Sequence, residues 1–391
     1  MRRWLAAPLL LIAAVSFSFW SGPPQLQAQS KAEAPIEETF LTADGVQLRG
    51  LFHKSTKDPS TAPVVILMYP PGKGANDKVN DMDTGDWVGL ANRLAGEGFN
   101  VFRFDWRGHG KSTDIKDKDK FWGLDPMNPN PFTATWNLRH IIGAPPKKPI
   151  KDTILLKDLK DPVRYAPMFL TDMAAVRFHL DSKNDAGDLN SSSIYLIGAE
   201  SAAAIGLAFM TMEWHRPAFA PKPNELGGAP RYDYVPQPLR IPPDPAGGAD
   251  ISGAVWLSAR RPTSIPENLI KSWISRGAPK LRDNNPMLFL YAENDRVGKS
   301  HAEFFHIEAL VGKGDRRNGL NPLNDAYLKE LKGADKLSGV GLLGNNDKLK
   351  TEDTIIRFLE AIQKERVKIT RKQRNFTSPY FVSLSHFGFN P

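Results

Sequence analysis

Two adjacent residues with reactive side chains, Glu200 and Ser201, lie where an apolar run changes into a stretch of small residues. The run IYLIGA has the length and apolarity of a buried strand, and SAAAIGLAFM has the composition of a helix. A nucleophile can stand at the apex of such a turn when the residues around it are small. Either residue meets this condition, because the flanking positions hold only Gly198 and alanines. The stretch therefore predicts a nucleophile elbow with two alternative apex residues.

The elements that would position this turn alternate along the chain. Runs of strand length occur at 40–54 (a hairpin around Asp44-Gly45), 62–71, 100–108, 194–198, 251–259, 286–295 and 326–333. Stretches with helical spacing of apolar residues lie between them, at 87–94, 169–180, 201–210, 301–312 and 355–362. This alternation predicts an α/β fold with a mostly parallel central sheet and helices on both faces.

One motif gives the pattern a family resemblance. The run Asp105-Trp106-Arg107-Gly108-His109-Gly110-Lys111-Ser112 follows a predicted strand. It resembles the D-x-R-G-x-G-x-S turn of the α/β-hydrolases, and the chain resembles their serine-aminopeptidase and monoacylglycerol-lipase-like branch over roughly residues 37–364. The resemblance implies an α/β-hydrolase fold. The arginine and glycines of this turn shape a loop and break no bond, so we interpret His109 as structural.

The resemblance also implies places for a nucleophile and an acid. The family pattern apolar-x-Leu-Ile-Gly-x-nucleophile aligns without a gap when Glu200 is the apex, which favours Glu200 over Ser201. Asp295, at the end of PMLFLYAEND, takes the position of the triad acid. An aspartate of an ordinary surface loop is the alternative interpretation of Asp295.

The position of the catalytic histidine holds a different residue. Family members carry this histidine shortly before the last helix, where the present chain has KGADKLSG with Lys336 at about the same place. His301 and His306 belong to a helical stretch and are expected to lie on its surface or pack. His386 lies beyond the last helix and reaches the site only if the tail folds back. The resemblance therefore implies a degenerate triad.

The oxyanion hole is altered as well. Two prolines follow the strand at 62–71, and proline has no N–H to donate, so the donors there would be Gly72 or Lys73, with Ser201 on the opposite side. For the remnant triad we predict that Lys336 lies between Glu200 and Asp295 as an ion-pair cluster.

The first 28 residues predict a secretory signal peptide. Two arginines precede the apolar run WLAAPLLLIAAVSFSFW, and small residues precede a cleavage point after Ala28. An uncleaved anchor is the alternative. The expected location is secreted or periplasmic. The chain has no cysteine, which excludes a disulfide framework and thiolate chemistry.

A polar linker at 29–36 leads to a hydrolase-like domain at 37–366, which has insertions near 114–164 and 217–250 and is followed by a basic and aromatic tail at 367–391. The insertions are either lids or wraps over a sheet edge. The tail is expected to pack on the domain, and contact with a membrane or envelope surface is the alternative. The net charge is +8, but no nucleic-acid, cofactor or metal motif accompanies it, so none of these is predicted.

Three functions remain open from the sequence. The first is a secreted protein of hydrolase fold that has lost catalysis and binds a small molecule or an envelope polymer. The second is an active serine hydrolase (a carboxylesterase, lipase or aminopeptidase) that uses Ser201 and Asp295. The third is a non-enzymatic structural protein of the envelope. The first is favoured, because the apex, base and oxyanion positions all depart from the pattern of the family that the chain resembles, and fold alone does not establish activity.

Overall fold

The computed structural model describes residues 34–71, 86–124, 131–220, 244–311, 327–344, 346–380, 384 and 388–389. The predicted signal peptide, Gly72, Lys73 and His386 lie outside the described residues. Within this part of the chain, no helix combines the length and the apolarity needed to cross a membrane.

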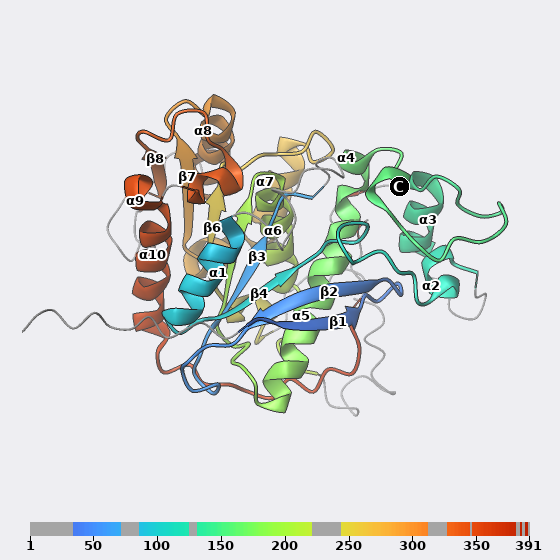
Figure 1. Cartoon of the computed structure of the whole chain (residues 1–391), viewed down its shortest axis with the longest axis horizontal. Helices are drawn as coiled ribbons and strands as arrows, with labels where there is room; N and C mark the ends of the chain where they lie inside the picture. Colours follow the sequence, from blue (N-terminus) through green and yellow to red (C-terminus); the bar gives the residue numbers. More distant parts are fainter. Residues whose placement is uncertain are drawn as a thin grey trace, which may run out of the picture. The chain divides into compact units, whose positions relative to one another are not determined.

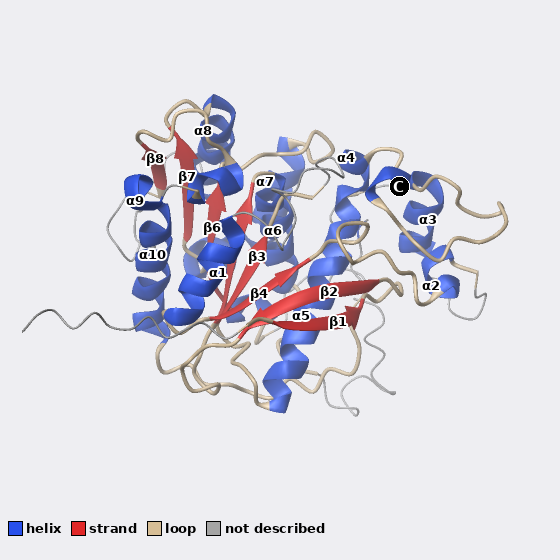
Figure 2. Cartoon of the chain, viewed as in Figure 1, coloured by secondary structure: helices blue, strands red, loops and turns tan. Residues whose placement is uncertain are grey.

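Eight strands form one sheet in the order β1-β2-β4-β3-β5-β6-β7-β8 (Figure 2). Their bounds are β1 Ile36–Leu41, β2 Gln47–His53, β3 Val64–Met68, β4 Asn100–Phe104, β5 Ile194–Ala199, β6 Ile251–Leu257, β7 Met287–Ala292 and β8 Leu328–Leu331. The pairs β1–β2 and β2–β4 are antiparallel, and all the other pairs are parallel. The mostly parallel sheet predicted from the alternating pattern is thus confirmed. β3 and β5 are buried at every residue, as expected for strands covered on both faces.

Helices cover the two faces of this sheet (Figure 1). Helix α6 packs against both α5 and α7, whereas α1 and α10 both contact the short helical turn Gly339–Leu343. The bounds of the helices are α1 Asp86–Gly96, α5 Phe169–Ala186, α6 Ser201–Glu213, α7 Glu267–Asn284, α8 Arg296–Glu303, α9 Asn346–Leu349 and α10 Thr351–Arg366. Helix α7 has no counterpart among the elements predicted from the sequence.

In its described residues, 114–124 and 131–164, the insertion contains the short helices α2 Lys118–Trp122 and α3 Pro131–His140 and the start of α4 Pro162–Tyr165. The rings of Trp122, Trp136 and Tyr165 are buried, and they belong to the same hydrophobic core as the residues of the sheet. The Ser264 hydroxyl, in the loop after β6, donates a hydrogen bond of 2.6 Å to the carbonyl oxygen of Val163. This contact joins segments that leave the sheet on either side of β3 and β5, where the elbow lies.

The turn after β4 is held by a fully buried arginine, Arg107. Its guanidinium donates to Asp44 at 2.7 and 2.9 Å and to Asp172 at 2.7 Å. His109 contacts the carbonyl oxygen of Arg107 through Nδ1, and burial lowers the pKa of this imidazole. These contacts tie the turn to the first hairpin and to α5, which is the structural role expected for this motif.

Candidate functional site

The elbow between β5 and α6 has Glu200 at its apex. Glu200 is the only residue between the end of the strand and the first helical residue, Ser201. Its backbone has φ 49° and ψ −117°, a conformation that residues with a β-carbon rarely adopt. A strained residue at the strand-to-helix turn is typical of a nucleophile elbow. The structure therefore places Glu200, and not Ser201, at the apex.

The side chain of Glu200 is buried, with 5% of the residue exposed. Its carboxylate accepts a hydrogen bond of 3.1 Å from the Ser338 hydroxyl. The residue after Ser338, Gly339, has φ +54°, and a β-carbon there would lie 2.9 Å from Cγ of Glu200. The loop that carries the histidine in the family that the chain resembles is thus packed directly on the elbow, and it contributes a hydroxyl.

Asp295 lies just beyond β7 and begins helix α8. Its Oδ1 accepts the backbone N–H of Gly298 at 2.9 Å and a guanidinium N–H of Arg260 at 3.1 Å. Its Oδ2 is buried and has no hydrogen-bond partner among the described residues. The carboxylate at the position of the triad acid is therefore paired with an arginine on one oxygen, and its other acceptor is unused there.

Arg260 also connects this acid to the elbow. Its backbone N–H donates to the carbonyl oxygen of Glu200 at 3.0 Å, while its guanidinium reaches Asp295. Arg260 follows β6, whose carboxyl end lies between those of β5 and β7 in the sheet. Arg260 is not among the site residues predicted from the sequence. Its signal was the pair of arginines directly after an apolar strand, at the edge where the elbow and the acid also emerge.

The structure does not bring Lys336 between the two carboxylates. Lys336 is exposed, whereas Glu200 is buried and Asp295 is paired with Arg260. The physical reason lies in the anchoring of the loop, because the Ser338 hydroxyl binds Glu200 and leaves Lys336 on the solvent side. An ammonium keeps its hydration there, whereas burial would remove it. The cluster expected from the sequence is therefore replaced by a hydroxyl at the elbow and a guanidinium at the acid.

His301 is the described histidine whose surroundings include Asp295. Its Nδ1 accepts the backbone N–H of Arg261 at 3.2 Å, so this nitrogen is directed at the main chain. Burial, with Arg261 and Arg260 nearby, lowers the pKa of His301. His301, in α8, is thus a structural group bound to the start of the loop after β6, and this hydrogen bond does not involve the acid.

The oxyanion side of the site is described only in part. The predicted donors Gly72 and Lys73, and the tail residue His386, lie outside the described residues. Ser201, predicted on the opposite side, is half-buried at the first position of α6. Its place directly after the apex is the one at which α/β-hydrolases provide a backbone donor.

Neither a family model nor a curated protein matches the chain. Solved structures do match. An esterase of Rhizomucor miehei is 12% identical, with 86% of this chain and 87% of the esterase covered and a TM-score of 0.41. A hyperthermophilic esterase from Pyrobaculum calidifontis is 11% identical, with 86% of each chain covered and a TM-score of 0.42. A dienelactone hydrolase from Anabaena variabilis is 10% identical, with 84% and 98% covered and a TM-score of 0.41.

Similarity this low identifies no activity. The fold is evident from the chain's own architecture: a mostly parallel eight-stranded sheet whose second strand is antiparallel, a strained elbow after β5 and an acid after β7. These features are those of the α/β-hydrolase fold, and the chain has that fold.

Proposed function

We propose that this chain is a secreted protein of α/β-hydrolase fold that does not carry out serine-hydrolase chemistry and acts by binding a small molecule or an envelope polymer. One observation carries the proposal. The apex of the elbow is a buried glutamate held by Ser338, and the acid beyond β7 is held by Arg260. Ser338 and Arg260 thus bind the two carboxylates, and neither of these partners is a base.

The chemistry of hydrolysis supports this proposal. A serine nucleophile needs a base within hydrogen-bond reach, and the base needs an acid that orients it. Arg260 cannot serve as that base, because a guanidinium stays protonated at any pH at which the protein works. A glutamate at the apex would form a mixed anhydride with an acyl donor, or an ester with an alkyl donor, as the leaving group departs. Hydrolysis of either intermediate again needs a base that activates water. The site retains shape and charge, which are the properties that binding requires.

The alternative is an active serine hydrolase that uses Ser201 with Asp295. It is favoured by the buried Oδ2 of Asp295, which is unused among the described residues, since a histidine N–H is what this oxygen accepts in a working triad. It is opposed by the position of Ser201 in the first turn of α6, one residue past the strained apex.

A fluorophosphonate probe distinguishes the two. We expect the mature protein to show no labelling and no turnover of short-chain esters, and the Ser201→Ala variant to behave in the same way. Labelling or turnover that disappears in Ser201→Ala would overturn the proposal in favour of the serine hydrolase. Turnover that survives Ser201→Ala but is lost in Glu200→Gln would overturn it in favour of a glutamate nucleophile.

A further variant tests whether the nucleophile is the only part of the catalytic machinery that is missing. Glu200→Ser places a hydroxyl at the apex while Asp295 and Arg260 are unchanged. Because the proposal includes no base, we expect this variant to be at most weakly labelled and to turn over no ester. Efficient turnover by Glu200→Ser would show that a base is present after all.

A further inference from the structure

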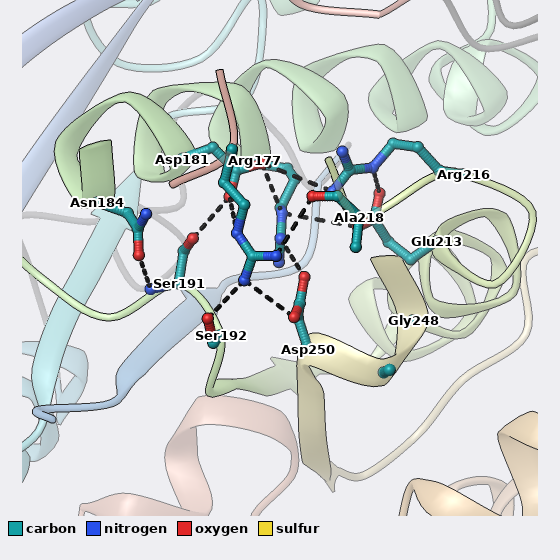
Figure 3. Close-up of polar contacts among 12 residues, drawn as sticks. Arg177, Asp181, Asn184, Ser191, Ser192, Glu213, Arg216, Ala218, Gly248 and Asp250 are labelled. Carbon is teal, nitrogen blue, oxygen red and sulfur yellow. Dashed lines mark hydrogen bonds and ion pairs between the residues drawn. The ribbon is translucent and has the colours of Figure 1, made fainter. Parts of the chain in front are cut away.

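A set of buried charged side chains lies at the end of the sheet opposite to the elbow. It joins the carboxyl-terminal half of α5, the end of α6 and the turn before β6 (Figure 3). Its members in the domain are three carboxylates and two guanidinium groups: Asp181, Glu213, Asp250, Arg177 and Arg216. All five are less than a tenth exposed. By itself this set carries one negative charge too many.

The two domain arginines are both engaged with these acids. Arg216 binds Glu213 through two parallel hydrogen bonds of 2.9 Å. Arg177 binds Asp181 at 3.1 Å and Asp250 at 2.7 Å. Figure 3 shows these side chains turned toward one another between the helices and the turn. Asp181 also lies 3.6 Å from Arg216, and Glu213 lies 3.7 Å from Arg177, so the two guanidinium groups are shared among the three carboxylates.

The third cation comes from the tail. Arg374 is 1% exposed, and its Nη2 donates to Asp250 at 3.0 Å and to the Ser192 hydroxyl at 2.6 Å. Its Nε lies 4.0 Å from Asp181. Three guanidinium groups then face three carboxylates, and the buried charge is balanced. Leaving a buried charge without its partner is among the costliest changes a folded protein can undergo.

The backbone of the tail is bound as specifically as this side chain. Both oxygens of Asp185 accept backbone N–H groups, those of Arg374 at 2.7 Å and Asn375 at 2.8 Å. Two asparagine side chains, Asn184 and Asn190, donate to tail carbonyl oxygens at 2.8 Å each. Contacts from fixed groups to the main chain are the manner in which a protein binds an extended peptide.

Aromatic residues of the tail complete the contact. The rings of Phe376 and Tyr380 lie over the Arg216 guanidinium, with centroids 4.9 and 5.2 Å away. The Tyr380 hydroxyl donates to Glu213, and Tyr380 is buried. The tail also reaches the second insertion, because the N–H of Ala220 donates to the carbonyl oxygen of Arg374 at 2.8 Å.

We propose that this part of the domain is a peptide-binding groove specific for an arginine followed by aromatic residues, and that the chain fills it with its own residues 369–380. The tail is then an intrachain ligand. It neutralises the buried acids and holds the amino-terminal end of the 217–250 insertion. The basic residues of the tail differ in their exposure. Arg374 is buried against the domain, whereas Lys368, Arg371 and Lys372 are exposed.

Hydrogen exchange on the full-length chain tests this assignment. Arg374→Met keeps the length and apolar bulk of the side chain but removes the charge and the donors. We expect exchange of the backbone amides of Asn375 and Ala220 to accelerate roughly tenfold or more, together with faster proteolysis between residues 367 and 380. Lys372→Met is the matched control, since it removes an exposed charge of the same segment, and it should leave both readouts unchanged.

Two further variants keep the test decisive if Arg374→Met does not fold. Arg374→Lys retains the charge without the planar fork, so it should fold and release the tail partially. Arg374→Met combined with Asp250→Asn removes the cation and one carboxylate together, so it should fold with a released tail. Unchanged exchange at Asn375 and Ala220 in either variant would overturn the proposal. So would an equal effect of Lys372→Met and Arg374→Met.

Discussion

The strained backbone at the apex of the elbow predicts that glycine is more stabilising than alanine at this position, which is the reverse of the usual order. Glu200 adopts φ 49° and ψ −117°, where a β-carbon is poorly tolerated. We compare Glu200→Ala with Glu200→Gly. Both variants lose the hydrogen bond from Ser338, so this loss cancels in the difference. Only the glycine variant loses the β-carbon that causes the strain.

The expected difference follows from two opposing contributions. Relief of backbone strain stabilises the glycine variant by roughly 1–3 kcal/mol. The greater freedom of glycine in the unfolded chain costs about 0.4–1 kcal/mol. We therefore expect Glu200→Gly to have a free energy of unfolding about 1 kcal/mol higher than that of Glu200→Ala. Urea denaturation followed by tryptophan fluorescence measures this difference from the midpoints, provided that the two slopes agree.

Ser201 provides the matched control, because it is the next residue and already helical. There the order should be the usual one, with Ser201→Ala more stable than Ser201→Gly by about 0.5 kcal/mol. If Glu200→Gly were no more stable than Glu200→Ala while the Ser201 pair kept its usual order, the strain at the apex would be refuted.

Three other outcomes follow from buried contacts. Arg107→Met should lower the free energy of unfolding by about 3–5 kcal/mol, because it leaves two carboxylates buried without their cation. Lys111→Met is the control, since it removes the cation of an exposed ion pair and should change the free energy of unfolding little. Thermal unfolding compares the two variants, and equal losses of stability would contradict this account. Burial and a neighbouring arginine lower the pKa of His53 from 6.5 to about 4. The folded state thus resists protonation of His53, so this residue should destabilise the protein as the pH falls from 6.5 to 4, by up to about 3 kcal/mol, and leave stability unaffected above that window. Urea unfolding from pH 7 to 4 should show a shallower decline in His53→Gln, and an identical decline would contradict the assignment. Gly110 has φ +47°, and a β-carbon there would lie 2.3 Å from a buried carboxylate oxygen, so Gly110→Ala should lower the free energy of unfolding by about 2 kcal/mol. In Gly96→Ala the new β-carbon meets no atom within 4 Å, so this control variant should keep its stability. Equal melting temperatures for the two variants would contradict the tight packing of the turn at Gly110.

The sheet and the elbow could be predicted because their signals are local. A fully apolar run such as that of β5 is buried on both faces wherever it lies, and a small-residue helix directly after it admits few geometries. The register of the elbow is local too, since the spacing around Gly198 leaves Glu200 at the apex. These inferences needed no knowledge of what lies across the fold.

The partners of the two carboxylates could not be predicted in this way. Asp295 is bound by Arg260, which lies 35 residues earlier in the chain, and which of several basic residues reaches an acid depends on loop conformation. A family pattern predicts Lys336 near the two carboxylates, but the loop that carries it is anchored by Ser338, and the Lys336 side chain is exposed to solvent. Sequence patterns indicate which strand end a residue follows, and they do not indicate which way its side chain points.

The buried charges that join α5, α6 and the tail also determine when, during synthesis of the chain, the domain can complete its folding. The three carboxylates enter the nascent chain long before Arg374. Until that arginine has been made, only Arg177 and Arg216 are available to them within this set. The domain therefore cannot reach its final stability while the ribosome still holds the tail.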